Sequence, residues 1–329
     1  MGSPRIASLL PSATEIVCAL GAGAEIVGLS HECDFPPEST SGKPVLTSTR
    51  VRKGLPSAAI DRKVREILRV ALAVYEVDVE ALERARPSVI VTQDLCEVCA
   101  VSLEDVRRAL STIGHSAETG IRVVNLHPTC LEDVLRDVLT IGAAIGRERE
   151  AALVAAGMRE RLQKVRARAA AIPGPRPSVL TIEWLDPVMV GGTWMPELVD
   201  IAGGRALVTK PGDHAPTLSR DELERLAPEV VVIKPCGFDL ARTRREMAAF
   251  LEGRGWPALQ SGRVWIADGN AYFNRPGPRL ADSAEILAAC IRPQAFQDFA
   301  ALHASAFEPA QLGDPSLQAG LSSHCRPVS

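Results

Sequence analysis

The chain has 329 residues, with 37 Lys and Arg against 40 Asp and Glu, which gives a formal net charge of −3. Domains typically hold about 100–200 residues, so this length predicts two domains. Hydrophobic residues make up 46% of the chain and charged residues 23%, which excludes a mainly disordered protein because a core can be buried. The near-neutral charge gives no reason to expect nucleic acid or an anionic membrane as a partner.

No segment of the sequence has the pattern of a transmembrane helix or a secretory signal. The apolar run Ile6–Leu10 stops at Pro11 and is followed by Glu15. A spanning helix needs about 20 mostly apolar residues, and a signal needs an unbroken apolar stretch of about 7–15. We therefore expect this chain, as written, to be cytoplasmic.

Strands and helices alternate in the first part of the chain. Residues 36–57 are rich in Pro, Ser, Thr and Gly, which predicts a loop. The other expected elements are strands at 5–10, 25–29, 88–92 and 122–126, and helices at 59–73, 79–85 and 103–110. A further helix is expected after the first strand, capped by Ser12 or Thr14 and ended by the glycines at 21 and 23.

A stretch without Pro runs from Leu131 to Ala171, and its apolar residues recur at intervals of three and four positions. This spacing predicts one long helix, or two helices with a joint near Gly142 to Gly146. Alternation of strand and helix resumes from Ser178 to about Arg292. The predicted organisation is an α/β lobe at 1–130, a linking helix at 131–172, a second α/β lobe at 173–292, and a short helix with a loose tail at 293–329.

A shift of 141 residues superposes two helix–Pro–strand segments, which begin at Glu80 and Asp221. Their sequences are EALERARPSVIV and DELERLAPEVVV. Any α/β protein contains similar units, so chance likeness is one explanation. The other is a duplicated architecture of two Rossmann-like lobes with parallel sheets and a ligand cleft between them.

Groups able to bind a metal follow two of the predicted strands. His31, Glu32 and Cys33 follow one strand, and Asp94, Cys96 and Cys99 follow another. Imidazole and thiol groups bind borderline or soft metals, and C-x-x-C spacing suits zinc or a redox pair. We expect a metal at His31, Cys33, Cys96 and Cys99. The alternatives are that the two C-x-x-C thiols pack at a helix start and that His31 is an ordinary hydrogen-bonded histidine.

Several bulky or basic side chains lie near other predicted strand ends. Tyr272 could stack on a ring system, and Arg275 and Arg279 could meet carboxylate or amide oxygens. Trp194, Cys236 and Phe238 also lie near strand ends, with core packing as the alternative for the tryptophan. The sequence contains no P-loop, no G-x-G-x-x-G after a strand and no G-x-S-x-G, so nothing in it requires an enzyme.

The segments Arg5–Glu15 (RIASLLPSATE) and Val27–Pro36 (VGLSHECDFP) resemble the start of the helical-backbone periplasmic binding proteins. The stretches Gly192–Gly204 and Arg275–Arg279 (RPGPR) are also similar to that family. The resemblance covers about residues 5–292, and the cobalamin-binding branch is the most similar. It implies two α/β lobes bridged by a long rigid helix. It also implies that the chain is the substrate-binding component of an ABC importer for cobalamin or ferric siderophores.

The resemblance also assigns roles to single residues. Glu80 and Asp221 match the acidic positions with which family members dock onto arginines of a permease. Glu32, Arg50 and Ala215 stand where the cobalamin binder has aromatic rings. The expected ligand-binding residues are His31, Glu32, Cys33, Arg50, Asp94, Cys96, Trp194, Cys236, Phe238, Tyr272 and Arg275.

Two main hypotheses of function therefore remain open, beside a third, an electron-transfer dithiol protein, which rests on the C-x-x-C spacing alone. In the first, a monomeric, non-catalytic protein binds cobalamin, another corrinoid or an iron chelate between its lobes and delivers it to an ABC permease. In the second, a cytosolic metal-binding protein or enzyme reuses the fold around the His and Cys cluster.

Overall fold

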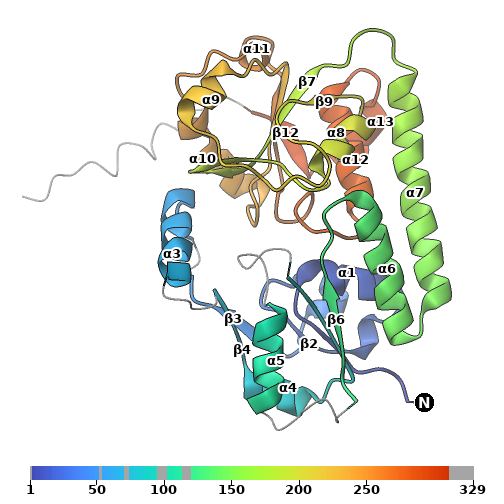
Figure 1. Ribbon diagram of the computed structural model, residues 1–329. Coiled ribbons are helices and arrows are strands. Elements are labelled where there is room, and N and C mark those ends of the chain that lie inside the picture. Colours follow the sequence, from blue (N-terminus) through green and yellow to red (C-terminus); the bar gives the residue numbers. More distant parts are fainter. Residues whose placement is uncertain (1, 52–53, 70–73, 95–101, 113–119, 311–329) are drawn as a thin grey trace, which may run out of the picture. The chain divides into compact units, whose positions relative to one another are not determined.

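The computed structural model describes residues 2–51, 54–69, 74–94, 102–112 and 120–310. Contacts divide the chain into two compact units, each of which is drawn in Figure 1. Unit 1 comprises residues 1–164 with 275–281, and unit 2 comprises 165–274 with 282–329. The chain thus leaves unit 2 after Asn274, contributes seven residues to unit 1 and returns at Asp282. The lobe boundaries expected from the sequence stay a prediction.

Unit 1 contains a four-stranded parallel sheet in the order β2-β1-β5-β6. These strands are Ile26–Leu29, Ile6–Ser8, Val89–Gln93 and Arg122–Leu126. All five residues of β5 are buried, as expected for a central strand of a parallel sheet covered by helices. The helices of this unit are α1 (Pro11–Ala19), α2 (Pro37–Thr40), α3 (Ser57–Arg69), α4 (Val79–Ala85), α5 (Leu103–Thr112) and α6 (Leu131–Ile145), with a 3₁₀ turn, η1 (Gly23–Glu25).

The segment 36–57, expected to be a loop, contains more structure than the sequence indicated. It holds α2, the first residue of α3 and β3 (Thr47–Thr49), which pairs antiparallel with β4 (Tyr75–Val77). A strand of three residues is too short to show the alternating pattern by which strands are recognised.

Unit 2 contains a six-stranded mixed sheet, whereas the sequence predicted a parallel one. Four of its strands are parallel: β9 (Arg205–Ala206), β7 (Ser178–Leu185), β10 (Val230–Ile233) and β11 (Val264–Ala267). The antiparallel members are β8 (Val188–Val190) and β12 (Phe307–Pro309). The helices are α8 (Met195–Ile201), α9 (Arg220–Arg225), α10 (Leu240–Leu251), α11 (Pro257–Gln260), α12 (Leu280–Ile291) and α13 (Gln297–Leu302).

The first residues of the expected loose tail belong to this sheet. β12 pairs with β11, and the ring of Phe307 lies 5.6 Å from that of Trp265. Aromatic contact and pairing with an edge strand hold this segment in place. With three residues, it is too short to show a pattern from which a strand could be predicted.

The expected long helix is two helices in succession. α6 ends at Gly146, whose φ of 70° is readily reached by glycine, and α7 (Glu148–Ala170) follows. The boundary between the units falls inside α7, so this helix carries the chain from one unit to the next. No helix among the described residues is long and apolar enough to cross a membrane.

The duplicated helix–Pro–strand pattern predicted from the sequence is confirmed as secondary structure. α4 and β5 in unit 1 correspond to α9 and β10 in unit 2. Both strands lie inside their sheets, next to β1 and β7 respectively.

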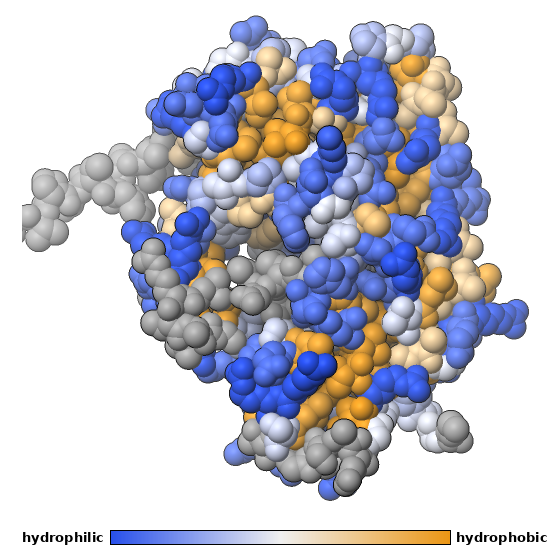
Figure 2. All heavy atoms as spheres, viewed as in Figure 1, coloured by the Kyte–Doolittle hydropathy of each residue, from blue (hydrophilic) through white to orange (hydrophobic). Residues whose placement is uncertain are grey.

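Surface apolar residues are scattered in the described part of the chain. Figure 2 shows orange areas between blue ones on the visible face. The exposed large apolar side chains come from separate elements and are Phe35, Val45, Leu139, Leu153 and Leu302. Scattered apolar residues are ordinary on a protein surface and do not by themselves indicate a partner.

Candidate functional site

The carboxyl ends of the unit 1 strands meet at one edge of the sheet. Residues 30–34 follow β2, α1 follows β1, Asp94 follows β5 and His127 follows β6. The connection after β1 leads to β2 on one side, and the connection after β5 leads to β6 on the other, which makes a topological switch point between β1 and β5. Open parallel sheets bind ligands at such an edge.

His127 and Asp94 form an exposed pair at this edge. The imidazole Nδ1 lies 2.7 Å from Asp94 Oδ1, and Asn125 donates to Asp94 Oδ2 at 2.7 Å. The two side chains are 55% and 44% exposed. Partial burial opposes ionisation of Asp94, but the hydrogen bonds from His127 and Asn125 outweigh it and lower the pKa of the carboxyl group.

The ionised Asp94 determines which nitrogen of His127 carries the proton. A carboxylate only accepts hydrogen bonds, so Nδ1 must be the protonated nitrogen. In the neutral ring, Nε2 is then a lone-pair donor, and no partner for it is found among the described residues. This is the arrangement in which a carboxylate orients a metal-binding histidine.

His31 is held inside unit 1. Its Nδ1 lies 2.8 Å from Thr47 Oγ1, and its ring lies 5.2 Å from the ring of Tyr75. Nε2 is 3.1 Å from Glu32 Oε1, but it is buried and lacks hydrogen-bond geometry with that oxygen. One ring nitrogen of His31 is thus bonded to Thr47 and the other is not hydrogen-bonded, so its role as a metal ligand stays a prediction.

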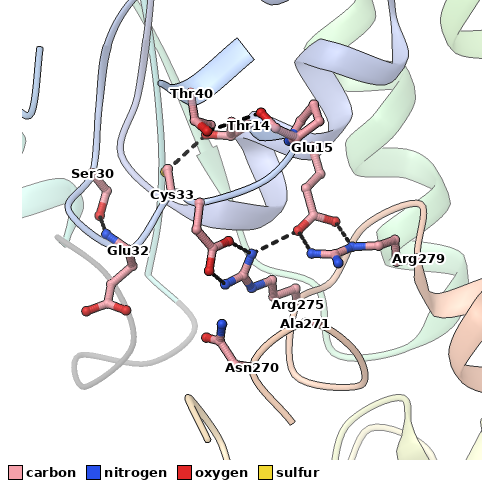
Figure 3. Close-up of polar contacts among 12 residues, drawn as sticks. Thr14, Glu15, Ser30, Glu32, Cys33, Thr40, Asn270, Ala271, Arg275 and Arg279 are labelled. Carbon is pink, nitrogen blue, oxygen red and sulfur yellow. Dashed lines mark hydrogen bonds and ion pairs between the residues drawn. The ribbon is translucent and has the colours of Figure 1, made fainter. Parts of the chain in front are cut away.

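Cys33 lies in the segment 30–34 that follows β2, and it is a poor candidate for a thiolate. Burial raises the pKa of its thiol to about 12, against the lowering effects of Thr14, Ser30 and Arg275. The hydroxyl of Thr14 donates to Sγ at 3.1 Å, as seen in Figure 3. Cys96 and Cys99, the other expected thiol ligands, lie outside the described residues.

Arg275 and Arg279 form a clamp on two carboxylates of unit 1 (Figure 3). Arg275 binds Asp34 with two hydrogen bonds, of 2.6 and 3.1 Å, and lies 3.2 Å from Glu15 Oε1. Arg279 donates to Glu15 Oε2 at 2.8 Å, and its guanidinium lies 4.1 Å from the centre of the Phe35 ring. The carboxylates outweigh burial and raise the pKa of Arg275.

The two arginines were expected to meet carboxylate or amide oxygens, and the carboxylates they meet belong to this chain. Arg275 is 6% exposed and its charge is already neutralised by Asp34 and Glu15. The segment 275–281 is therefore fixed to the start of α1 in unit 1.

The corresponding edge of unit 2 contains a buried cation. Lys234, directly after β10, is fully buried, and its Nζ lies 3.2 Å from Glu183 Oε2 and 2.8 Å from Asn274 Oδ1. Asn274 also donates to the backbone oxygens of Lys234 and Gly269. These bonds tie the end of β10 to the segment that leads out of unit 2.

Trp194 and Phe238 are core residues of unit 2. Trp194 is 5% exposed and its indole N–H donates to Phe273 O at 2.7 Å. Phe238 is 1% exposed, packs at 5.3 Å against the ring of Trp184 and has the Arg242 guanidinium 3.5 Å from its ring centre. Core packing, the alternative for Trp194, agrees with this burial.

The other expected ligand-binding residues lie in partly exposed positions. Cys236 is half-buried, with its backbone N–H bonded to Glu183 O at 3.0 Å. Tyr272 is also half-buried, with its ring 6.5 Å from that of Phe273. Arg50 is paired with Glu76 in unit 1.

The two expected docking residues are exposed in the first turns of their helices. The Glu80 side chain in α4 is 86% exposed and lies 3.4 Å from Arg84. Asp221 in α9 is also exposed. Both carboxylates are stabilised by the helix dipole whatever else they do.

The sequence reasoning missed His127 as a site residue, although it had a usable signal, because the histidine directly follows a predicted strand. It also missed Glu15 and Asp34 as partners of the arginines. No local pattern could reveal those pairs, because Glu15 and Arg275 are 260 positions apart.

Comparison with known proteins identifies similar chains. The sequence profile of the family described as "Periplasmic binding protein" matches residues 6–271. A vitamin B12-binding protein of Photorhabdus laumondii is 22% identical over 86% of each chain. An ABC transporter substrate-binding lipoprotein of Bacillus subtilis is 23% identical over 89% of this chain and 82% of its own. A periplasmic heme-binding protein of Pseudomonas aeruginosa has a TM-score of 0.66 at 22% identity, covering 88% of this chain and 93% of its own.

Proposed function

Since the chain belongs to the periplasmic binding protein family, a family of ABC-transporter substrate-binding proteins and not of enzymes, we propose that its ligand is a metal-centred tetrapyrrole. That class includes cobalamin, other corrinoids and haem, and two of the similar proteins are named for binding vitamin B12 and heme.

The observation that carries this proposal is the exposed His127–Asp94 pair. A corrinoid or a haem offers an axial position on cobalt or iron, which a neutral imidazole can occupy. Asp94 holds the proton of His127 on Nδ1, so the exposed Nε2 is the donor atom that such a metal needs. Asn125 in turn orients Asp94 by a hydrogen bond, so the position of the His127 ring is fixed by two neighbouring side chains.

Other residues of the same edge would serve the polar rim of the ligand. Glu32 and Asp34 are 37% and 54% exposed, and carboxylate oxygens have several lone pairs, so both side chains could also accept hydrogen bonds from amide groups of a corrinoid. The clamp of Arg275 and Arg279 would support this rim from below by holding Asp34 and Glu15. Trp194 and Phe238, which are buried, would act by shaping unit 2.

The permease contact is also a proposal. Glu80 and Asp221 would dock onto arginines of a permease, because both are exposed carboxylates at corresponding helix starts. The expected cytoplasmic location stays a prediction, and the family to which the chain belongs is described as periplasmic. The alternative of a His and Cys metal site gains nothing from Cys33, whose thiol stays protonated.

The test is a titration of the purified chain with hemin and, separately, with aquocobalamin, followed by absorbance. We expect one equivalent of at least one of the two to bind, with a spectrum typical of an axial nitrogen ligand. His127→Ala should weaken binding by about tenfold or more, since it removes the metal ligand, and should abolish that spectrum. Asp94→Asn should weaken binding less and leave the axial nitrogen in place.

His214→Ala is the matched control, because it removes an exposed histidine of unit 2. It should bind and absorb as the unchanged chain does. Binding of neither compound would contradict the tetrapyrrole proposal. Equal affinity and equal spectra for His127→Ala and the unchanged chain would contradict the role of His127.

A further inference from the structure

A second group of side chains that could bind a metal lies within unit 2. Asp282 and Glu285 are one turn apart on α12, and His303 directly follows α13. Residues three apart share a helix face, so both carboxylates point the same way. None of the three lies in the stretch 6–271 that matches the family profile.

The ligand atoms of these residues converge. One donor atom from each of Asp282, Glu285 and His303 lies within 4.8 Å of the other two. His303 Nε2 is 2.7 Å from Glu285 Oε2. Bond lengths of about 2.0–2.2 Å allow donors of one ion to be up to about 4.4 Å apart, so the side chains need to move by only a few tenths of an ångström.

The burial of the group distinguishes it from an ordinary acidic surface. Glu285 is 5% exposed and His303 is 8% exposed, while Asp282 is half-buried. Burying carboxylates is costly unless a cation or several hydrogen bonds compensate. A protonated His303 supplies one positive charge, whereas a divalent ion supplies two and also uses the imidazole as a neutral ligand.

We propose that Asp282, Glu285 and His303 bind a first-row divalent cation such as Mn²⁺ or Zn²⁺. Two carboxylate oxygens and one imidazole nitrogen suit such ions, and water would complete the coordination. The ion would hold the C-terminal segment with α13 and β12 to α12. This site is independent of any ligand bound through His127.

The experiment is a Mn²⁺ titration of the untagged, metal-stripped chain, with the signal of free Mn²⁺ followed by electron paramagnetic resonance. Mn²⁺ is chosen because it prefers oxygen and nitrogen ligands over thiols, which keeps the cysteines out of the measurement. We expect one saturable site and a higher melting temperature with the ion, because the folded state binds it.

Glu285→Gln and His303→Gln are the informative variants, because each amide can keep a hydrogen bond to the remaining partner. Both should weaken Mn²⁺ binding by at least about tenfold, the lower end of the effect of losing even a hydrogen-bond partner of a metal ligand. Asp298→Asn is the matched control on α13, where Asp298 pairs with Arg168 outside the group. It should bind Mn²⁺ as the unchanged chain does.

Absence of a saturable site in the unchanged chain would overturn the proposal. So would equal Mn²⁺ affinity of the unchanged chain and both Gln variants. Asp282→Asn gives a further test at the half-buried position, and its Mn²⁺ affinity should also fall if the proposal holds. Normal circular dichroism of each variant establishes that the loss is one of binding.

Discussion

The two units place different chemistry at the same position in their sheets. Where parallel strands end in unit 1, His127 and Asp94 are about half exposed and Nε2 of the imidazole has no partner among the described residues. Where β10 ends in unit 2, Lys234 is fully buried and bonded to Glu183 and Asn274. One strand-end edge thus has a free donor atom for a ligand, and the other uses its charged groups to hold its own chain together.

The comparison predicts that the unit 2 group matters for stability. Lys234→Met removes the cation and leaves the Glu183 carboxylate, 18% exposed, without its charge partner. Breaking a buried ion pair by removing one partner costs about 3–5 kcal/mol, and we expect that loss in the free energy of unfolding measured in urea.

The double variant Lys234→Met with Glu183→Gln is the control. Replacing both charges removes the uncompensated carboxylate, so this protein should be more stable than Lys234→Met alone. If the free energy of unfolding of Lys234→Met falls by less than about 1 kcal/mol, the ion pair of Lys234 with Glu183 contributes no more to stability than an exposed pair does.

The clamp of unit 1 should give the next largest loss of stability. We expect the loss to differ between its two carboxylates. Glu15 is 3% exposed and serves both arginines, whereas Asp34 is 54% exposed. Glu15→Gln should cost about 2–3 kcal/mol, because it leaves buried guanidinium groups with fewer partners. Asp34→Asn should cost less than about 1 kcal/mol, as exposed ion pairs do. Equal urea midpoints for the two variants would contradict this reading.

The sequence predicted the parts of both units that rest on local patterns. Runs of apolar residues ending at Pro or Gly located β5, β10 and the helices before them, because burial of one face dictates the spacing. β3 and β12 were missed because three residues show no period. The joint at Gly146 was predicted as one of two alternatives, and its positive φ explains why the helix ends there.

The site was less predictable because its pairs join distant positions. His127 follows a predicted strand, but the Asp94 that orients it comes 33 positions earlier on another strand. The environment of Trp194 was also not predictable, because an aromatic ring before a helix can face either a ligand or the core. Here its N–H is bound inside unit 2 at Phe273, and sequence alone does not contain that contact.

Unit 1 contains a partly buried carboxyl group whose buried oxygen lacks the hydrogen bonds that Lys234 makes. Asp137 on α6 has an Oδ2 that is buried without a hydrogen-bond partner. Burial and the nearby Asp133 raise the pKa of its carboxyl from 3.8 to about 7, against the lowering effects of Arg136 and His127. The folded protein therefore keeps a proton on Asp137 between about pH 4 and pH 7, whereas the unfolded chain has lost it.

This difference in bound protons fixes the sign of the pH dependence. Stability falls as pH rises from about 4 to 7, because in that range the folded state binds more protons than the unfolded state. Asp137→Asn removes the penalty, so it should raise the free energy of unfolding by about 1–3 kcal/mol at pH 8 and change it little at pH 4. Urea unfolding at both pH values measures this, with Asp298→Asn as an exposed control. A variant that is equally stable or less stable at pH 8 would mean that the carboxylate of Asp137 is compensated, as Lys234 is in unit 2, and the contrast between the units would then not extend to their buried charges.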